Sequence, residues 1–185
     1  MNKLFKTTAI ILALLTSINI YAQMGNTVNV GGEAMYPKKN IVENAVNSKA
    51  HTTLVAAVQA AGLVETLKSA GPFTVFAPVN DAFENLPAGT VETLLKPENK
   101  KALTNVLTYH VVSGSYDYEA LAAMIKKGDT KLATVSGGSL WIYQNGSHNI
   151  AIKDESGNWA NITTYDVTQS NGVIHVIDAV LLPKM

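Results

Sequence analysis

Residues 171–183 read Asn-Gly-Val-Ile-His-Val-Ile-Asp-Ala-Val-Leu-Leu-Pro, and most of this stretch is apolar. From Val173 to Leu182 both alternating faces are apolar, except for His175 on one face and Asp178 on the other. Because successive residues of a strand point to opposite faces, a strand of this composition is covered on both sides. The stretch therefore predicts a strand in the middle of a sheet.

The residues before this stretch alternate between apolar and polar side chains with a period of two. Gly-Gly, Asn-Gly and Ser-Gly-Asn turns separate the apolar runs, which is typical of hairpins. The expected strands are Leu132–Val135, Leu140–Tyr143, Asn149–Lys153 and Trp159–Thr163, with a further short strand over Tyr165–Gln169. The pattern predicts a meander of antiparallel strands that leads into the buried one.

Helical periodicity dominates from Asn40 to Gly128. A strand over Phe73–Ala77 interrupts it, and Asn80 or Asp81 is expected to cap the short helix that follows. Asp117 is expected to cap a helix over Tyr118–Lys127 that Gly128 ends. Helices first and antiparallel strands later predict an α+β fold in one domain over residues 40–183.

The composition excludes several classes of protein. The chain has 185 residues, with 14 lysines, 14 acidic residues, no arginine and no cysteine. A net charge of zero without arginine predicts no nucleic-acid partner. Without cysteine the chain has no disulfide, no thiolate nucleophile, no cysteine-ligated metal and no cysteine-linked lipid anchor.

The N-terminus has the pattern of a secretory signal peptide over residues 1–22. Lys3 and Lys6 precede an apolar run over residues 7–18, and Ala22 offers a small residue at the cleavage site. The run is shorter than the roughly 20 residues that span a membrane. We expect a secreted protein, extracellular or periplasmic, that is not lipid-anchored and is not stably inserted in a membrane after cleavage. Export without disulfides fits bacterial secretion.

Cleavage changes the charge and leaves a short lead-in. Loss of Lys3 and Lys6 leaves 12 basic and 14 acidic residues, a net charge of −2. Residues 23–39 are rich in glycine and asparagine and show neither helical nor strand periodicity. We expect them to form a flexible lead-in to the domain.

The sequence contains no catalytic or metal-binding pattern with specific spacing. The four histidines are never three or four residues apart, and the Gly-x-Ser-x-Gly pattern is absent. We expect no metal, no cofactor and no enzymatic activity. His51 is expected at the start of a helix and His148 on a hairpin loop, and residues 154–157 are expected to form a hairpin turn.

His110 and His175 are the histidines with two open interpretations. His110 follows the apolar stripe of a helix that Pro97 opens, and at the helix end it can interact with free carbonyl groups. His175 is interpreted as a buried imidazole that one or two hydrogen bonds satisfy, with a ligand-binding role as the alternative. Asp178 is expected to accept hydrogen bonds, because an unpaired buried carboxylate is costly.

Three segments together resemble the fasciclin (FAS1) domain family. Gly71–Phe83, followed by Leu86-Pro87, is similar to the family's first conserved box, Thr-x-Phe-Ala-Pro-x-Asx-x-Ala-Phe. Tyr109-His110 is similar to its Tyr-His motif, and residues 171–183 are similar to its second box. The order and spacing of the three agree with the family over about residues 40–183.

The resemblance implies a FAS1-like fold, in which a helical N-terminal part packs on a β-wedge of two mostly antiparallel sheets. It also implies that the two boxes lie on adjacent core strands. The residues that carry over as scaffold are Thr74, Phe76, Pro78, Asn80, His175 and Asp178. Tyr109 and His110 carry over as a candidate adhesion motif, with packing at the end of a helix as the alternative.

The function that the resemblance implies is a secreted, non-enzymatic adhesion or interaction module at the cell surface or in the matrix. Its partner would be a cell-surface or matrix protein or a polysaccharide. A first alternative is a small-ligand-binding or hydrolytic domain that uses His110 or His175 with a nearby carboxylate. A second alternative is weak self-association that stabilises surface assemblies.

Overall fold

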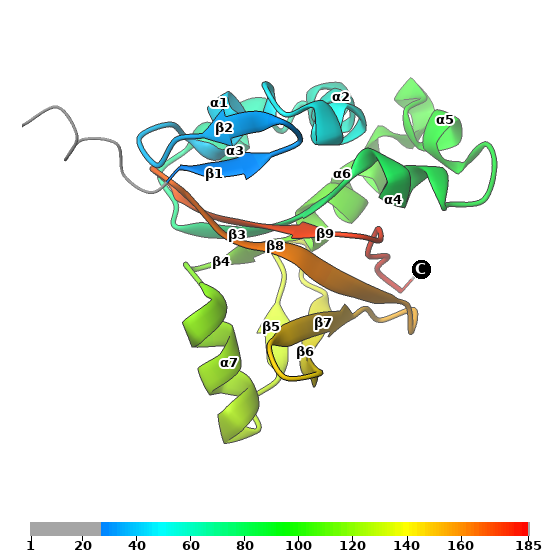
Figure 1. Cartoon of the computed structure of the whole chain (residues 1–185). Coiled ribbons are helices and arrows are strands. Elements are labelled where there is room, and N and C mark those ends of the chain that lie inside the picture. Colours follow the sequence, from blue (N-terminus) through cyan, green and yellow to red (C-terminus); the bar gives the residue numbers. More distant parts are fainter. Residues whose placement is uncertain (1–26, 185) are drawn as a thin grey trace, which may run out of the picture.

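The computed structural model describes residues 27–184 (Figure 1). The helices are α1 (Ile41–Ala45), α2 (Thr52–Ala61), α3 (Val64–Lys68), α4 (Asn80–Glu84), α5 (Thr90–Leu94), α6 (Lys100–Tyr109) and α7 (Tyr118–Lys127), with single 3-10 turns at Lys49–His51 and Pro97–Asn99. The strands are β1 (Val28–Val30), β2 (Glu33–Met35), β3 (Phe73–Pro78), β4 (Val111–Ser113), β5 (Lys131–Ala133), β6 (Ser139–Asn145), β7 (Asn149–Lys153), β8 (Trp159–Gln169) and β9 (Gly172–Ile177).

Seven strands form one continuous sheet in the order β4-β3-β9-β8-β7-β6-β5. Only β3 and β9 run parallel to each other, and every other pair in this sheet is antiparallel. The long strand β8 pairs with β7 through its first residues and with β9 through the rest, with register shifts between Ile162 and Val167. Irregularities of this kind bend a strand. The bent β8 therefore joins two sheet halves into a wedge, and the expected α+β fold is confirmed.

The outer strands of the two halves meet at the narrow side of the wedge. Val112 of β4 forms a β-bridge with Thr134, just beyond β5. The N–H of Val135 donates to the carbonyl of Val111 at 2.8 Å. These contacts close the sheet around an apolar interior.

Strand β9 is the central strand that its sequence predicts, because β3 covers one edge and β8 the other. Its odd-numbered residues, such as Ile177, face the wedge interior, where they join Phe76 and the buried residues of β6 and β7. Its even-numbered residues, Ile174 and Val176, face the helical layer. Both faces are buried, as the two-sided apolar composition requires.

Asn171 and Gly172 fix the start of β9 against the helical layer. The Asn171 side chain accepts from the N–H of Ile41 at 3.0 Å and donates to the carbonyls of Leu67 and Ser69. A Cβ atom at position 172 would lie 2.0 Å from the carbonyl oxygen of Phe73. Only glycine therefore allows β9 to approach β3 at this point.

The helices α1, α2, α3 and α6 form a layer above the β3–β9 pair (Figure 1). Within this layer, Val58 and Ala61 of α2 pack against Leu103 and Leu107 of α6. On the opposite side of the sheet, Leu121 of α7 packs into the wedge interior. Asp117 caps α7 through the N–H of Ala120 and Gly128 ends it, both as predicted. No helix within residues 27–184 has the length and apolar character to cross a membrane.

Asn80 corrects one sequence-based expectation. It does not cap the helix that follows it: Val79 occupies that position and Asn80 is the first residue of α4. Its side-chain oxygen instead accepts from the N–H of Thr53 at 3.1 Å, and its amide donates to the carbonyl of Lys49 at 2.9 Å. Asn80 therefore provides a hydrogen-bond partner for a free N–H group at the start of α2. The two are far apart in sequence, so local patterns could not indicate this contact.

The expectation of a flexible lead-in is wrong for residues 28–35, where β1 and β2 form a hairpin. Gly31 and Gly32 both have positive φ angles at the turn, which suits the twist of a tight hairpin. Val30 and Met35 are buried against the helical-layer side of the sheet. Each strand has only three residues, too few to show an alternating pattern. The expected signal peptide, residues 1–22, lies outside the described residues.

Candidate functional site

Tyr109, the first residue of the candidate adhesion motif, ends α6 and is 0% exposed. Its phenol donates to the carbonyl of Ser139 at 2.6 Å and accepts from the N–H of Glu155 at 2.9 Å. Burial raises the pKa of Tyr109 to about 12, so the hydroxyl remains protonated. Tyr109 therefore fastens α6 to the start of β6 and to the turn between β7 and β8.

His110, the second residue of the motif, is 3% exposed and is also fully engaged. Its Nδ1 lies 2.8 Å from the carbonyl of Val106, and its Nε2 accepts from the N–H of Leu181 at 3.0 Å. These partners require a neutral ring with the proton on Nδ1. Burial lowers the pKa of His110 to about 4, which agrees with a neutral ring. Tyr109 and His110 are therefore both buried within the fold.

His175 lies on β9 directly beside Phe76 of β3, with the ring centroids 5.8 Å apart and the rings nearly parallel. It is 0% exposed. Its Nε2 lies 2.7 Å from the carbonyl of Tyr116, and its Nδ1 accepts from the N–H of Asp166 at 3.4 Å. Burial lowers the pKa of His175. Both ring nitrogens are hydrogen-bonded to backbone groups of the protein, so neither is free to bind a ligand.

The remaining residues of the two boxes hold loops to the sheet. The Thr74 hydroxyl donates to the carbonyl of Gly114 at 2.8 Å and accepts from the N–H of Tyr116 at 2.9 Å. The Asp178 carboxylate accepts from the backbone N–H of Asn161 at 2.7 Å and from its amide at 2.9 Å. Pro78 is buried at the end of β3. These residues lie in the framework of the fold.

The expected hairpin turn over residues 154–157 contains a buried carboxylate, that of Asp154. Asp154 is 2% exposed and accepts from the backbone N–H groups of Asn158, at 2.7 Å, and of Leu182, at 2.8 Å. It joins the turn to the C-terminal segment. The bond to Asn158 could have been predicted, because an aspartate at the start of a turn often accepts a hydrogen bond from a backbone N–H that follows.

His51 is a buried histidine whose surroundings the sequence did not indicate. It lies where the 3-10 turn meets α2 and is 1% exposed. Its Nδ1 lies 2.9 Å from the hydroxyl of Ser48, whereas its Nε2 has no hydrogen-bond partner. Among the side chains of residues 27–184, this is the one buried polar atom without a partner. The sequence spacing agrees with this burial. His51 precedes the apolar residues Leu54 and Val58 by three and seven positions, the spacing of one helical face.

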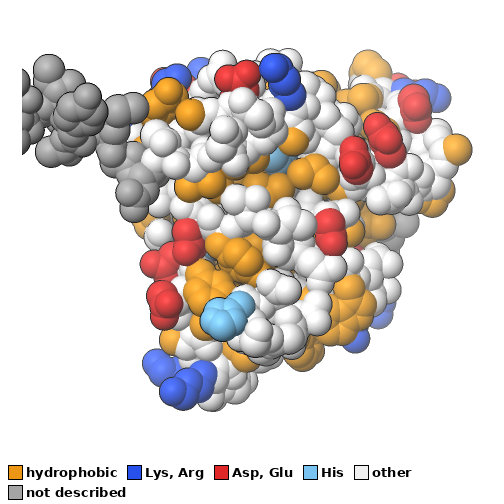
Figure 2. All heavy atoms as spheres, in the orientation of Figure 1, with side chains coloured by type: hydrophobic (Ala, Val, Ile, Leu, Met, Phe, Trp, Pro, Cys, Tyr) orange, Lys and Arg blue, Asp and Glu red, His pale blue; other side chains and the backbone are white. Residues whose placement is uncertain are grey.

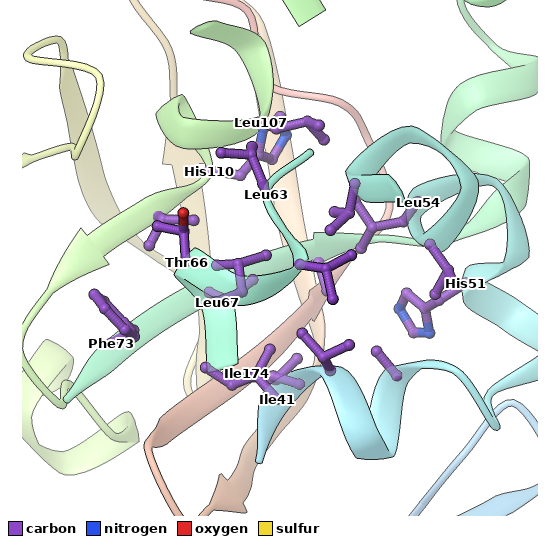
Figure 3. Close-up of a pocket in the computed structure, with 18 of the residues that line it drawn as sticks. Ile41, His51, Leu54, Leu63, Thr66, Leu67, Phe73, Leu107, His110 and Ile174 are labelled. Atoms are coloured by element: carbon purple, nitrogen blue, oxygen red, sulfur yellow. The ribbon is translucent and has the colours of Figure 1, made fainter. Parts of the chain in front are cut away.

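A cavity of about 340 Å³ lies between the helical layer and the β3–β9 pair (Figure 3). Figure 2 shows apolar side chains along a recess at this level of the molecule. The labelled lining residues are Ile41, His51, Leu54, Leu63, Thr66, Leu67, Phe73, Leu107, His110 and Ile174. The space opens to solvent, because its lining includes Val46 and Val135, which are 50% and 45% exposed. Its volume falls in the range of about 300–1,000 Å³ that is common for small-molecule pockets.

Neither His110 nor His175 is placed to act as the base of a hydrolytic site at this cavity. His175 does not line the cavity, and both ring nitrogens of His110 are held by backbone groups. A general base needs a free nitrogen within reach of the substrate. Within residues 27–184 there is also no group of three histidine, aspartate or glutamate side chains that could hold a metal.

An aromatic surface lies on the outer face of the β6–β8 meander and consists of Tyr143, Lys153 and Trp159. Tyr143 is 39% and Trp159 49% exposed. Their ring centroids are 5.1 Å apart, and Nζ of Lys153 lies 5.5 Å from the centroid of the Trp159 ring. The three residues come from three adjacent strands, so the sheet fixes their relative positions.

Comparisons with known proteins agree with this architecture. A family model described as "Fasciclin domain" matches residues 49–183. Protein sll1483 of Synechocystis sp. is 50% identical over 147 residues, which cover 78% of this chain and 74% of that protein. Human periostin is 28% identical over 146 residues, which cover 79% of this chain but only 16% of periostin.

A bacterial relative and a solved structure give the same result. Immunogenic protein MPT70 of Mycobacterium tuberculosis is 35% identical over 146 residues, which cover 75% of this chain and 66% of that protein. The FAS1 domain pair of the insect cell adhesion molecule fasciclin I superposes with a TM-score of 0.70 at 18% identity, over 80% of this chain and 52% of that one. This likeness shows a shared fold. With the family model matched over most of the domain, the chain belongs to the fasciclin (FAS1) family.

Proposed function

We propose that this chain is a secreted, non-enzymatic adhesion or interaction module that binds a cell-surface or matrix component. The observation that carries the proposal is the aromatic surface of Tyr143, Lys153 and Trp159. Family membership supports it, since a structural relative is described as a cell adhesion molecule. Because Tyr109 and His110 are buried, the proposal places partner contact on the sheet and not on the Tyr-His motif.

The chemistry of the aromatic surface suits binding. Aromatic side chains offer a large contact area with few rotatable bonds, and tryptophan and tyrosine are enriched among residues that dominate binding energy. Here the two rings already contact each other, and Lys153 lies against Trp159. Little side-chain freedom would therefore be lost on binding. Single exposed apolar residues are common on any protein, but two exposed rings in mutual contact form a defined patch.

Binding to intact cells and to extracted matrix tests the proposal. Trp159→Ala should weaken binding by about tenfold or more, the range of a hot-spot residue. Tyr36→Ala is the matched control, because Tyr36 is also 39% exposed with Nζ of Lys39 5.2 Å from its ring centroid. Tyr36 lies beyond the β1–β2 hairpin and should be replaceable without loss. Equal binding by wild type and Trp159→Ala would refute the role of this surface.

The nature of the partner follows from the same assay. Protease treatment of the cells should abolish binding if the partner is a protein, and enzymatic removal of surface glycans should abolish it if the partner is a polysaccharide. Binding that survives both treatments would contradict both partner classes. Sedimentation of the chain over a range of concentrations tests self-association separately.

Secretion is the part of the proposal that rests on the sequence pattern of residues 1–22. Sequencing the N-terminus of the protein recovered from the periplasm or the medium should give a chain that begins near Gln23. Recovery of the protein only from the cytoplasm, with Met1 retained, would contradict secretion.

A further inference from the structure

The outer face of the β5–β8 meander carries a row of alternating lysine and tryptophan residues that continues the aromatic surface. Strands β5, β6 and β7 lie in the lower part of Figure 1. Lys131 of β5 pairs in register with Trp141 of β6. Lys153 of β7 pairs with Trp141 on one side and with Trp159 of β8 on the other. Neighbouring positions on these strands, such as Ile152, point into the wedge interior, so the four side chains of the row point outward.

The row is accessible to a partner along its whole length. Lys131 and Trp159 are exposed, and Trp141 and Lys153 are half-buried. Tyr143 lies on the same face, two residues beyond Trp141 on β6, and its ring contacts the ring of Trp159. The side chains therefore form a continuous strip of aromatic and cationic groups.

The two lysines of the row are free to bind an anion. Within residues 27–184, neither Lys131 nor Lys153 takes part in a salt bridge. The outward-facing residues of β5, β6, β7 and the first part of β8 include no aspartate or glutamate. The carboxylate of Asp178 accepts hydrogen bonds from the backbone and the side chain of Asn161, so it is already engaged. The strip is therefore locally positive and suits a negatively charged partner.

The spacing within the row suits a polymer with a two-unit repeat. Neighbouring strands lie about 4.8 Å apart, so the two lysines are separated by about 10 Å, and so are the two tryptophans. In a β-linked chain of pyranose sugars, every second sugar recurs over a similar length. The faces of a pyranose ring carry C–H groups, which pack against the negative face of an indole ring. A carboxylate on every second sugar would then meet a lysine at the same interval.

We propose that this row binds an acidic polysaccharide in which a uronic acid alternates with a neutral sugar. The neutral sugars stack on Trp141 and Trp159, and the uronate carboxylates accept hydrogen bonds from Lys131 and Lys153. The inference rests on the proposed function, because it names the partner of the same surface. A neutral polysaccharide would leave both lysines without a counter-charge, and a protein partner would not require the regular spacing.

Titration of the full chain with three probes tests the proposal. The first is a hyaluronan hexasaccharide, in which glucuronate alternates with N-acetylglucosamine. The second is chitohexaose, a neutral chain of N-acetylglucosamine, and the third is poly-L-glutamate, which has carboxylates but no sugar rings. The hyaluronan probe should bind about tenfold more tightly than either of the others, and added salt should weaken its binding. Equal binding of chitohexaose, tighter binding of poly-L-glutamate, or no binding of the hyaluronan probe would each overturn the proposal.

Lysine variants locate the site. Lys131→Gln should weaken binding of the hyaluronan probe by about two- to fivefold, the range of an exposed ion pair, and should leave binding of chitohexaose unchanged. Lys127→Gln is the matched control, because Lys127 is an exposed lysine on α7, away from the meander. It should bind all three probes as the wild type does. Equal effects of the two substitutions on the hyaluronan probe would contradict the assignment of the row.

The aromatic variant separates this inference from the proposed function. If Trp159→Ala loses binding to cells while the wild type does not bind the hyaluronan probe, the adhesion role stands and the polysaccharide assignment fails, which points to a protein partner. If the wild type binds the hyaluronan probe while Trp159→Ala keeps full binding to cells, the polysaccharide site stands and the adhesion role of this surface fails.

Discussion

The two faces of the β3–β9 pair are buried differently. On the wedge face, Phe76, His175 and Ile177 are all 0% exposed and the apolar side chains form one continuous cluster. On the helical-layer face, Val75 and Ile174 are also buried, but a cavity of about 340 Å³ separates part of the sheet from the helices. The same two strands thus line a filled core on one side and an apolar recess open to solvent on the other.

Two buried histidines show what this difference means. His175 on the wedge face has a partner at each ring nitrogen, whereas His51 on the helical-layer face has one at Nδ1 only. Burial is nearly equal, at 0% and 1% exposure. Burial alone therefore does not show whether both ring nitrogens of a histidine have hydrogen-bond partners.

The largest expected effect is the loss of packing on the wedge face. Phe76→Ala should lower the free energy of unfolding by about 3–5 kcal/mol, because the site is fully buried and can collapse only partly. Phe73→Ala, on the same strand but partly exposed and beside the cavity, should cost less than half as much. Urea denaturation of both variants measures the difference. Equal losses would contradict the comparison between the two faces.

Acid should destabilise the chain through its buried histidines. Burial lowers the pKa of His110 to about 4, and it lowers the pKa of His51 and His175 as well. Below their ordinary pKa of 6.5 the unfolded chain takes up protons that the folded chain does not. Stability is therefore fully present above pH 6.5 and falls as the pH decreases toward 4, by about 3 kcal/mol for His110 alone.

Denaturation curves at a series of pH values check this expectation. His148→Leu should retain the loss between pH 6.5 and pH 4, because His148 is exposed. His110→Leu should reduce the loss, whatever its effect on stability at neutral pH. A free energy of unfolding that is constant over this interval would show that the buried histidines titrate normally.

Replacing each of the two compared histidines by leucine should give unequal costs. His175→Leu leaves the carbonyl of Tyr116 and the N–H of Asp166 without their partner, and should cost about 1–3 kcal/mol. His51→Leu removes Nε2, which had no partner, and Nδ1, whose partner Ser48 keeps its bond to Val30. It should cost less than about 1 kcal/mol. Thermal melts of both variants measure the two losses of stability. A larger loss in His51→Leu than in His175→Leu would contradict the expectation that His175 contributes more hydrogen bonds to the fold.

Local sequence patterns predicted much of the fold. The two-sided apolar run placed β9 in the middle of the sheet, and the turns between the later strands defined the β5–β8 meander. The hairpin of β1 and β2 was not predicted, because strands of three residues are too short to show an alternating pattern. The contact of Asn80 with the start of α2 was not predicted, because α3 and β3 separate the two in sequence and only tertiary structure brings them together.

The candidate site was less accessible to sequence reasoning. The burial of His110 could have been predicted, since Leu103, Leu107 and His110 share one face of α6. The outward position of Tyr143 could also have been predicted, because it alternates with the buried Leu140 and Ile142. The cavity could not, because its volume depends on how far the helical layer stands from the sheet. The missing partner of His51 follows from the same tertiary spacing.

The smallest expected effect tests that spacing directly with two identical substitutions. Val112 is 2% exposed in the wedge interior, and Val58 is 9% exposed and lines the cavity. An added methylene in a filled core forces side chains out of their rotamers, so Val112→Leu should cost about 1 kcal/mol or more. Val58→Leu adds the same group beside empty space, and leucine is the better helix former. It should change the free energy of unfolding by less than about 0.5 kcal/mol, or raise it. A cost at position 58 that equals the cost at position 112 would contradict the difference in packing between the two faces.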